Sequence, residues 1–494
     1  PGVPANTYVS KLVASQHDAN TVFACFDNHK QGDFNPYVLK STDAGKTWTS
    51  IAGDLPTRGT VYCLGEDHML PNLLFVGTEF GLFVTLDGGK KWQRITNGLP
   101  TIQVKDLCVQ RKVNDLVIGT FGRGIYILDD YSALRAMKPE ALAKDAVLFP
   151  PRDAQLFIPS AQFGGAGKAF QGSSFYTADN PPYGATLTYH MKDSLKTRKQ
   201  IRQDAEKAAE KKGQPVPYPT PEELRLEAEE EAPTVFLVIK DADGNVVRTV
   251  TGPTAAGTHR VTWDLRDPGA TLPTARTREP GEDEDDGPPR GSGPLVAPGK
   301  YTATLHKRYR GEEAQLAGPV EFAVALDTLG SPDADAVKEQ VAFHREVLKL
   351  SRAVTGATNV ATELGTRLDA IRRALDTAPK ADEASKKHVR EMIDRNRDVL
   401  RALRGDSVLA ARNENVPLSI SSRVGTAARA SAQSLAKPTG TQKEQYAIAA
   451  KEFAEELAKL KKLADVEVPA LEKKLDAFGA PWTPGRLPAW DGGK

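Results

Sequence analysis

A stretch of eight residues occurs twice in this chain, as Ser41-Thr42-Asp43-Ala44-Gly45-Lys46-Thr47-Trp48 and, 44 residues later, as Thr85-Leu86-Asp87-Gly88-Gly89-Lys90-Lys91-Trp92. Both copies follow the pattern S/T-x-D-x-G-x-x-W and lie between two short runs of β-forming residues. We interpret each as a β-hairpin turn, in which the Asp accepts backbone N–H groups, the Gly adopts a positive φ and the Trp packs the hairpin onto its neighbours. This structural role is assigned to Ser41, Asp43, Gly45, Trp48, Thr85, Asp87, Gly89 and Trp92.

The spacing of the two copies indicates the architecture of the N-terminal region. A repeat of about 40–50 residues that contains four short strands is typical of a β-propeller blade. Residues 1–147 are therefore expected to form three blades, the third with a degenerate turn that keeps only Asp130 of the pattern. Because a closed ring needs at least about four blades, we expect a missing N-terminal part or another chain to complete the propeller.

The repeated turn resembles the Asp-box (BNR) repeat of sialidases, two-propeller xyloglucanases and sortilin-type receptors. The segments 26–37, 76–82 and 119–130 look like the last blades of large secreted bacterial proteins of the sortilin-like or glycosyl-hydrolase-like kind. This resemblance implies a secreted, periplasmic or cell-surface protein.

Residues 148–330 carry alternating β patterns at 185–191, 234–240, 246–251, 257–265, 299–306 and 320–326. Their spacing predicts an antiparallel β-sandwich of immunoglobulin type. The Gly257–Asp264 strand and the Pro298-Gly299-Lys300-Tyr301 turn resemble the Ig-like domain of flagellar hook-capping proteins. Two insertions are expected, a charged helical one at 192–232 and an acidic loop at 278–294.

The C-terminal third is predicted to be helical. Apolar residues at helical spacing indicate an antiparallel bundle over 331–480, with helices near 333–375, 382–403, 420–436 and 441–478. Thr441 and Glu444 have the spacing of a capping box, and Pro469 should bend or split the last helix. Residues 481–494 are expected to form an extended tail. The predicted fold class is thus multidomain, mainly β and then α.

Composition excludes several kinds of function. The 65 basic and 64 acidic residues nearly balance, so no global field favours nucleic acid or an anionic membrane. No apolar run is long enough for a membrane span. The three cysteines, Cys25, Cys63 and Cys108, are interpreted as buried core residues rather than as a disulfide framework. No sequence pattern calls for a metal or a cofactor.

Five polar residues form the candidate site. Asp27, His29 and Asp33 lie in a long loop of the first blade, and Glu79 and Arg123 lie in corresponding loops of the second and third. Neighbouring blades project such loops toward one face of the ring. Two interpretations remain open: a ligand or metal site, and a hydrogen-bonded network that joins adjacent blades.

Two functions are consistent with these features. The first is an exported, non-enzymatic binding or assembly protein that uses the propeller to hold a peptide or glycan, with the bundle serving self-association or docking. The alternative is a glycoside hydrolase of the two-propeller type whose catalytic acids lie mostly outside this chain. The blades favour the first, because they contain no paired-acid motif of the kind that glycoside hydrolysis needs.

Overall fold

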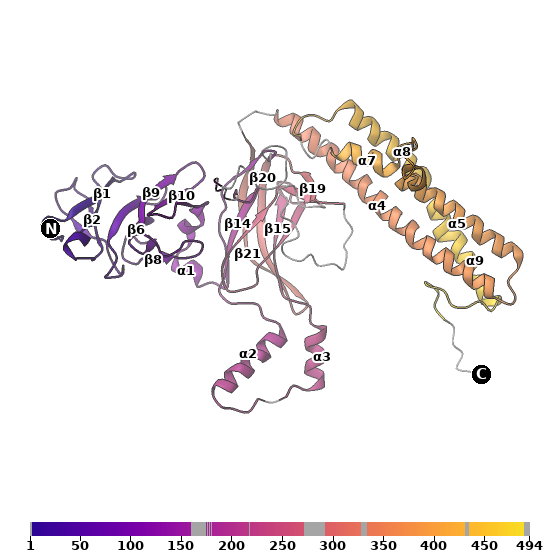
Figure 1. The fold of residues 1–494 in the computed structure, drawn as a ribbon, viewed down its shortest axis with the longest axis horizontal. Helices are drawn as coiled ribbons and strands as arrows, with labels where there is room; N and C mark the ends of the chain where they lie inside the picture. The colour runs from indigo at the N-terminus through magenta and orange to yellow at the C-terminus, as the bar shows by residue number, and fades with distance from the viewer. Residues whose placement is uncertain are drawn as a thin grey trace. The chain divides into compact units, whose positions relative to one another are not determined.

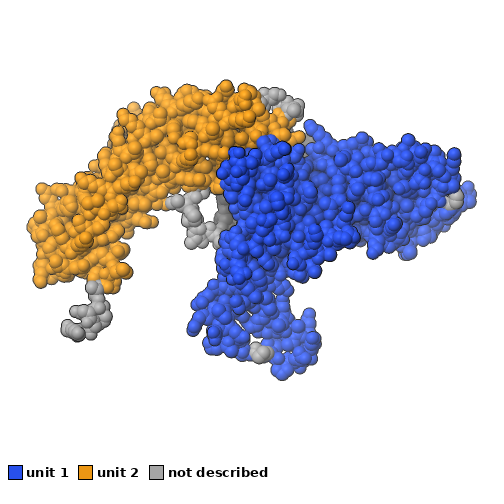
Figure 2. Space-filling view, turned by 180° about the vertical axis from the view of Figure 1, so that it is seen from behind, with its two compact units in different colours: residues 1–154, 180–263, 299–324 blue, residues 155–179, 264–298, 325–494 orange. Residues whose placement is uncertain are grey.

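The computed structural model describes residues 2–159, 174, 176, 178, 180–216, 218–270, 292–327, 333–429 and 434–488. The chain divides into two compact units, coloured separately in Figure 2. Unit 1 contains residues 1–154, 180–263 and 299–324, and unit 2 contains residues 155–179, 264–298 and 325–494.

Unit 1 begins with three successive antiparallel sheets (Figure 1). The first contains, in order, β1 (Tyr8–Ala14), β2 (Val22–Asp27), β3 (Tyr37–Ser41) and β4 (Thr49–Ser50). The second contains β5 (Val61–Glu66), β6 (Leu74–Thr78), β7 (Gly81–Thr85) and β8 (Gln93–Ile95). The third contains β9 (Val104–Gln110), β10 (Asp115–Thr120) and β11 (Ile125–Leu128), followed by η2 (Tyr131–Ala136) and α1 (Pro139–Leu142).

The repeated turns connect the third and fourth strands of the first two sheets, as predicted. In the second copy, the Asp87 carboxylate accepts hydrogen bonds from the Lys90 and Lys91 amides at 3.0 Å and from the Thr85 hydroxyl at 2.8 Å. The Trp92 indole then donates to the Ile51 carbonyl at 3.0 Å. The second turn therefore fixes its own hairpin and also joins the first sheet to the second.

The second sheet is buried on both faces. One face shares a core with the first sheet that includes Phe23, Leu64 and Trp92, and the other shares a core with the third sheet that includes Phe75 and Leu116. Its strands β5, β6 and β7 accordingly read as continuous apolar runs.

The first and third sheets leave apolar side chains exposed. Tyr8 and Leu12 on β1 are 70% and 63% exposed, and Ile125 and Ile127 on β11 are 71% and 57% exposed. The prediction that all three cysteines are buried is wrong for one of them: Cys25 and Cys63 are buried, but Cys108 is exposed. Cys108 lies on β9 of the third sheet, whose residues are mostly exposed or half-buried.

A second pair of sheets in unit 1 forms the predicted sandwich. One sheet has the order β12 (Ala146–Leu148), β14 (Ala185–Met191), β17 (Gly257–Trp263). In the other, β21 (Glu312–Leu326), β20 (Gly299–Tyr309), β15 (Thr234–Asp241) and β16 (Val246–Gly252) are consecutive neighbours. Trp263 and Tyr301 bring the two together, with ring centroids 5.3 Å apart in the core. The short strand β13 covers Ala154–Leu156.

The charged insertion of the sandwich is helical, as predicted. It forms α2 (Arg198–Lys211) and α3 (Pro221–Glu229), each begun by a capping box. Arg202 on α2 binds the Glu227 carboxylate of α3 through Nε at 2.7 Å and Nη2 at 2.9 Å, which holds the two helices together.

Unit 2 contains a short hairpin and the helices. The hairpin consists of β18 (Arg266–Pro268) and β19 (Ser292–Leu295). Residues 292–294 of the predicted acidic loop are thus strand, and the remainder of that loop lies outside the described residues. The helices are α4 (Ala334–Thr377), α5 (Glu383–Arg404), α6 (Ser407–Ala410), α7 (Ile420–Arg429), α8 (Gly440–Lys461) and α9 (Val468–Ala477), and η4 (Lys462–Glu467) is a π-helical segment.

The helices share one apolar core that includes Leu368, Val389 and Phe453. The predicted capping box at Thr441 is wrong by two residues: Thr439 and Gln442 form it, so the helix begins earlier. The last helix is interrupted as expected near Pro469, which occupies the first turn of α9 directly after the π-helical segment. Within the described residues, no helix is both long and apolar enough to span a membrane.

Candidate functional site

Asp27 and His29 form the part of the candidate site that belongs to the first sheet. Asp27 is the last residue of β2, and His29 opens the 3-10 turn η1 (His29–Gln31). The Asp27 carboxylate accepts from the His29 amide at 3.0 Å and contacts Nδ1 of the ring at 2.5 Å. This pairing fixes the imidazole at the end of the strand.

Asp33 organises the loop itself. Its carboxylate accepts hydrogen bonds from Asn28 Nδ2 at 2.9 Å, the Tyr37 hydroxyl at 2.8 Å and Asn35 Nδ2 at 2.8 Å. The bonds from Asn28 and Tyr37 lower the pKa of Asp33 to about 2. Both Asp33 oxygens therefore accept hydrogen bonds from within the loop.

Glu79 joins the second sheet to the third. It follows β6, and its two oxygens accept from the Tyr62 hydroxyl and from Gln103 Nε2, both at 2.9 Å. Tyr62 on β5 is buried, and this burial, with the hydrogen bond to Glu79, raises the pKa of its hydroxyl. The hydroxyl therefore remains protonated and holds Glu79 in place.

Lys105 on β9 lies beside these residues and, with Tyr62, Glu79, Gln103 and Phe121, forms what we call the Lys105 cluster. Its ammonium lies 3.3 Å from the centroid of the Tyr62 ring and 5.8 Å from that of Phe121, within the range of cation–π attraction. Partial burial lowers the pKa of Lys105, although the nearby negative charges of Asp27 and Glu79 act to raise it. The Lys105 ammonium donates no hydrogen bond to any of the described residues.

Tyr62 and Lys105 occupy equivalent positions. The β5–β6 register shifts between Val61 and Cys63, so that Tyr62 is the extra residue of a β-bulge. Lys105 is the corresponding extra residue on β9, between Val104 and Asp106. Because bulges redirect a side chain out of the regular alternation, the first strands of two neighbouring sheets direct Tyr62 and Lys105 to the same place.

Arg123 does not join this cluster. It is exposed between Gly122 and Gly124 in the β10–β11 turn and has no ion pair or hydrogen bond to the part of the chain that the structure describes. The structure thus places Asp27 and Glu79 near Tyr62 and Lys105, with His29 bound to Asp27 and Asp33 bound to Asn28 in the same loop. Arg123 has no described bond to any of these residues. The residues that sequence reasoning missed are Tyr62, Gln103, Lys105 and Phe121. Tyr62 and Lys105 lie 43 residues apart, which is close to the spacing of the repeated turns. This spacing is the sequence signal that could have identified them as equivalent positions.

The cluster offers binding groups rather than free acids. The Glu79 oxygens are engaged by Tyr62 and Gln103, and one Asp27 oxygen is engaged by His29. What the cluster presents outward is an ammonium and the ring of Phe121, which is 65% exposed. No group of three or more acidic, histidine or cysteine side chains among the described residues has the arrangement of a metal site.

One family matches part of the chain: residues 220–275 match the FlgD Ig-like domain, in agreement with the predicted Ig-like fold of this region. No curated protein matches the sequence.

Several solved structures show a distant likeness. An ancestral GH74 enzyme is 16% identical, with a TM-score of 0.23 over 38% of this chain and 26% of its own. The GH74 xyloglucanase from Xanthomonas campestris is 12% identical, with a TM-score of 0.21 over 62% and 38%. The extracellular domain of a one-component system from B. thetaiotaomicron is 11% identical, with a TM-score of 0.19 over 65% and 31%. This chain therefore spans well under half of each of these structures, and TM-scores this low carry no argument about function.

Proposed function

We propose that the chain is part of an exported binding or assembly protein, in which an Asp-box β-propeller arc presents the Lys105 cluster to a peptide or glycan. The observation that carries this proposal is the Lys105 ammonium, held over the Tyr62 ring and free of any described acceptor, beside the exposed ring of Phe121. An ammonium with free donors next to an exposed ring can bind an acceptor group and an apolar surface of one ligand together.

The arc itself is proposed to be completed by further blades, supplied by a missing N-terminal part or by another chain. The support is the exposed apolar residues on β1 and β11, which are edge strands of the first and third sheets. Large apolar side chains exposed to this extent are costly to leave in water.

The glycoside hydrolase alternative is not supported by these sheets. General acid catalysis by Glu79 or Asp27 would require a carboxyl group that reaches a glycosidic oxygen. Both oxygens of Glu79 and one oxygen of Asp27 are instead engaged by neighbouring groups of the protein. We therefore retain the binding function for the part of the protein in this chain.

Binding selections on the intact chain test the proposal. A random peptide library and a glycan array would each be screened against the wild-type protein, and any ligand found would be measured against Lys105→Met and, as a control, Lys112→Met. Lys112 is also exposed but lies in the β9–β10 turn. Selective loss of affinity in Lys105→Met would support the proposal, and equal affinity of both variants and the wild type would refute it.

A further inference from the structure

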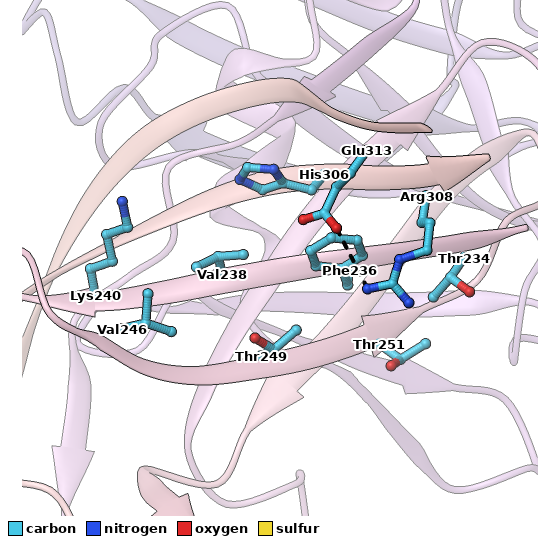
Figure 3. A pocket seen from close by; sticks show the side chains of 10 residues that line it. All are labelled: Thr234, Phe236, Val238, Lys240, Val246, Thr249, Thr251, His306, Arg308 and Glu313. Atoms are coloured by element: carbon cyan, nitrogen blue, oxygen red, sulfur yellow. Dashed lines mark ion pairs between the residues drawn. The ribbon is translucent and has the colours of Figure 1, made fainter. Parts of the chain in front are cut away.

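A groove runs over the outer face of the larger sandwich sheet, separate from the Lys105 cluster (Figure 3). Its volume of about 570 Å³ lies within the range of small-ligand sites. All of its lining residues belong to unit 1: Thr234, Phe236, Val238, Lys240, Val246, Thr249, Thr251, His306, Arg308 and Glu313.

Strand alternation explains which side chains face the groove. On β15, Val235, Leu237 and Ile239 are fully buried in the sandwich core, so the residues between them face outward. Across the sheet, Phe236 pairs with Thr251 on β16 and with His306 on β20. The next row pairs Thr234 with Arg308, and Arg308 in turn with Glu313 on β21.

Register irregularities border the groove on two sides. β15 and β16 shift between Ile239 and Lys240, and β20 and β21 shift on either side of Leu305, adjacent to His306. Bulges increase the local bend and twist of a strand. The sheet therefore changes its curvature locally at these two borders of the groove.

The floor of the groove is ordered by stacking. Phe236 faces outward yet is only 5% exposed, because the His306 ring stacks on it at 5.5 Å with an interplanar angle of 15° and the Arg308 guanidinium lies 5.8 Å from its centroid. His306 is held by a contact of 2.9 Å between Nε2 and the Thr304 hydroxyl. Burial lowers the pKa of His306, so the ring is neutral near pH 7 and provides a flat, uncharged surface.

The charged groups are nearly balanced. Arg308 lies between two carboxylates, 3.4 Å from Glu231 and 3.5 Å from Glu313. Lys240 forms no ion pair with any residue in the described part of the chain, and the Thr249 and Thr251 side chains are exposed. The groove therefore combines hydroxyl groups, an ammonium without an ion pair and the exposed ion pairs of Arg308 around a flat floor.

This chemistry favours one class of ligand. The backbone N–H and C=O groups of β15 and β20 are paired with a neighbouring strand on each side, so a ligand on this face is recognised through side chains. A peptide could be added as a strand only along the outer edge of β16. The near balance of charge gives no attraction for a strongly charged ligand. Hydroxyl, ammonium and guanidinium–carboxylate groups are all suitable partners for the hydroxyl groups of a sugar.

We propose that this groove binds a neutral oligosaccharide, whose hydroxyl groups contact Thr249, Thr251, Lys240 and the Arg308–Glu313 pair while one sugar face lies on His306. The proposal is independent of the function assigned to the Lys105 cluster, since no residue is shared.

The test uses the intact chain and three kinds of probe: neutral hexasaccharides of glucose or mannose, an oligogalacturonate of the same length, and an acidic peptide. The variant Thr249→Val/Thr251→Val removes two hydroxyl groups while keeping β-branched side chains that suit a strand. Thr258→Val, at an exposed position of β17 in the other sheet, is the matched control. Calorimetry would measure affinity, and thermal unfolding would verify that each variant is folded.

We expect a neutral hexasaccharide to bind the wild type, to lose about tenfold or more in affinity in the double variant, and to bind Thr258→Val and Lys105→Met normally. Binding of only the oligogalacturonate or the peptide would overturn the ligand class. Absence of neutral-sugar binding, or equal affinity in wild type and double variant, would overturn the site. Loss of binding in Lys105→Met alone would assign the sugar to the other cluster.

Discussion

The ammonium of Lys105 lies 3.3 Å from the centroid of the Tyr62 ring, and both residues are the extra residues of β-bulges in the first strands of adjacent sheets. The bulge occurs at the corresponding place in both sheets, so the contact between Lys105 and Tyr62 depends on the repeated architecture of the sheets. Tyr62 in turn donates to Glu79. A cation, an aromatic ring and a carboxylate from two sheets are thereby assembled at one edge.

The two glycines of the repeated turns should differ in their tolerance of alanine. Both have positive φ, +87° at Gly45 and +100° at Gly89, so backbone strain should cost about 1–2 kcal/mol at each. A Cβ at Gly89 would also lie 2.7 Å from the Ile51 carbonyl oxygen, whereas at Gly45 the nearest atom is a Trp48 ring carbon at 3.7 Å. Urea unfolding should show a clearly larger loss for Gly89→Ala, and equal losses would contradict the described packing of this turn against the first sheet.

Asp87→Ala should lower the free energy of unfolding by about 1–3 kcal/mol, because the Lys90 and Lys91 amides and the Thr85 hydroxyl lose their acceptor. Affinity for any ligand found should be unchanged. The paired measurements are thermal unfolding and ligand titration; loss of binding at unchanged stability would mean that the turn has a direct functional role.

His344 should make the protein less stable in acid. It is buried in unit 2, and burial, with a smaller contribution from the charge of Arg266, lowers its pKa to about 4. Unfolding returns the ring to its ordinary pKa near 6.5, so the unfolded state binds more protons between these values, and stability falls as pH decreases from 6.5 toward 4.

The size of this effect can be isolated with His344→Leu. Relative to that variant, the wild type should lose about 2–3 kcal/mol of unfolding free energy between pH 7.5 and pH 4. Urea unfolding at both values measures it, provided that the m-values agree. Parallel pH profiles for the two proteins would exclude the expected titration.

The exposed apolar residues on β1 and β11 should drive association of the chain. Leu12→Glu combined with Ile127→Glu should reduce the mass measured by light scattering and leave the melting temperature nearly unchanged, since both side chains are mostly exposed. Leu487→Glu is the control, because Leu487 is 92% exposed in the C-terminal segment. An unchanged mass in the double variant would argue that these residues do not mediate self-association of the chain.

The sequence predicts most of the secondary structure and much less of the site. The repeated turn, the alternation in β15 and the periodicity of α5 are local patterns, and local patterns determine the element that forms. The capping position at Thr439 was missed because two Thr-x-x-Gln/Glu spacings overlap there, and only the structure selects between them.

The site was harder to predict because its geometry depends on bulges. A bulge changes the face to which a residue points, and nothing in the residue types of Tyr62 or Lys105 signals one. Arg123 looked suitable by residue type and loop position, yet its turn holds it away from any described partner. Cys108 was misassigned for a related reason. The sequence comparison matched it to Cys63, but with Tyr62 and Lys105 as equivalent bulge residues the position equivalent to Cys63 is Asp106, and Cys108 is exposed on β9.

Binding of a ligand at the Lys105 cluster should change the reactivity of the Lys105 amine. A ligand from the peptide or glycan selection would be added at saturation to the intact chain, and acylation of Lys105 and Lys112 would be followed by mass spectrometry. The bound ligand should slow acylation of Lys105 severalfold and leave Lys112 unaffected. An unchanged acylation rate at Lys105, with the ligand demonstrably bound, would contradict binding at this cluster.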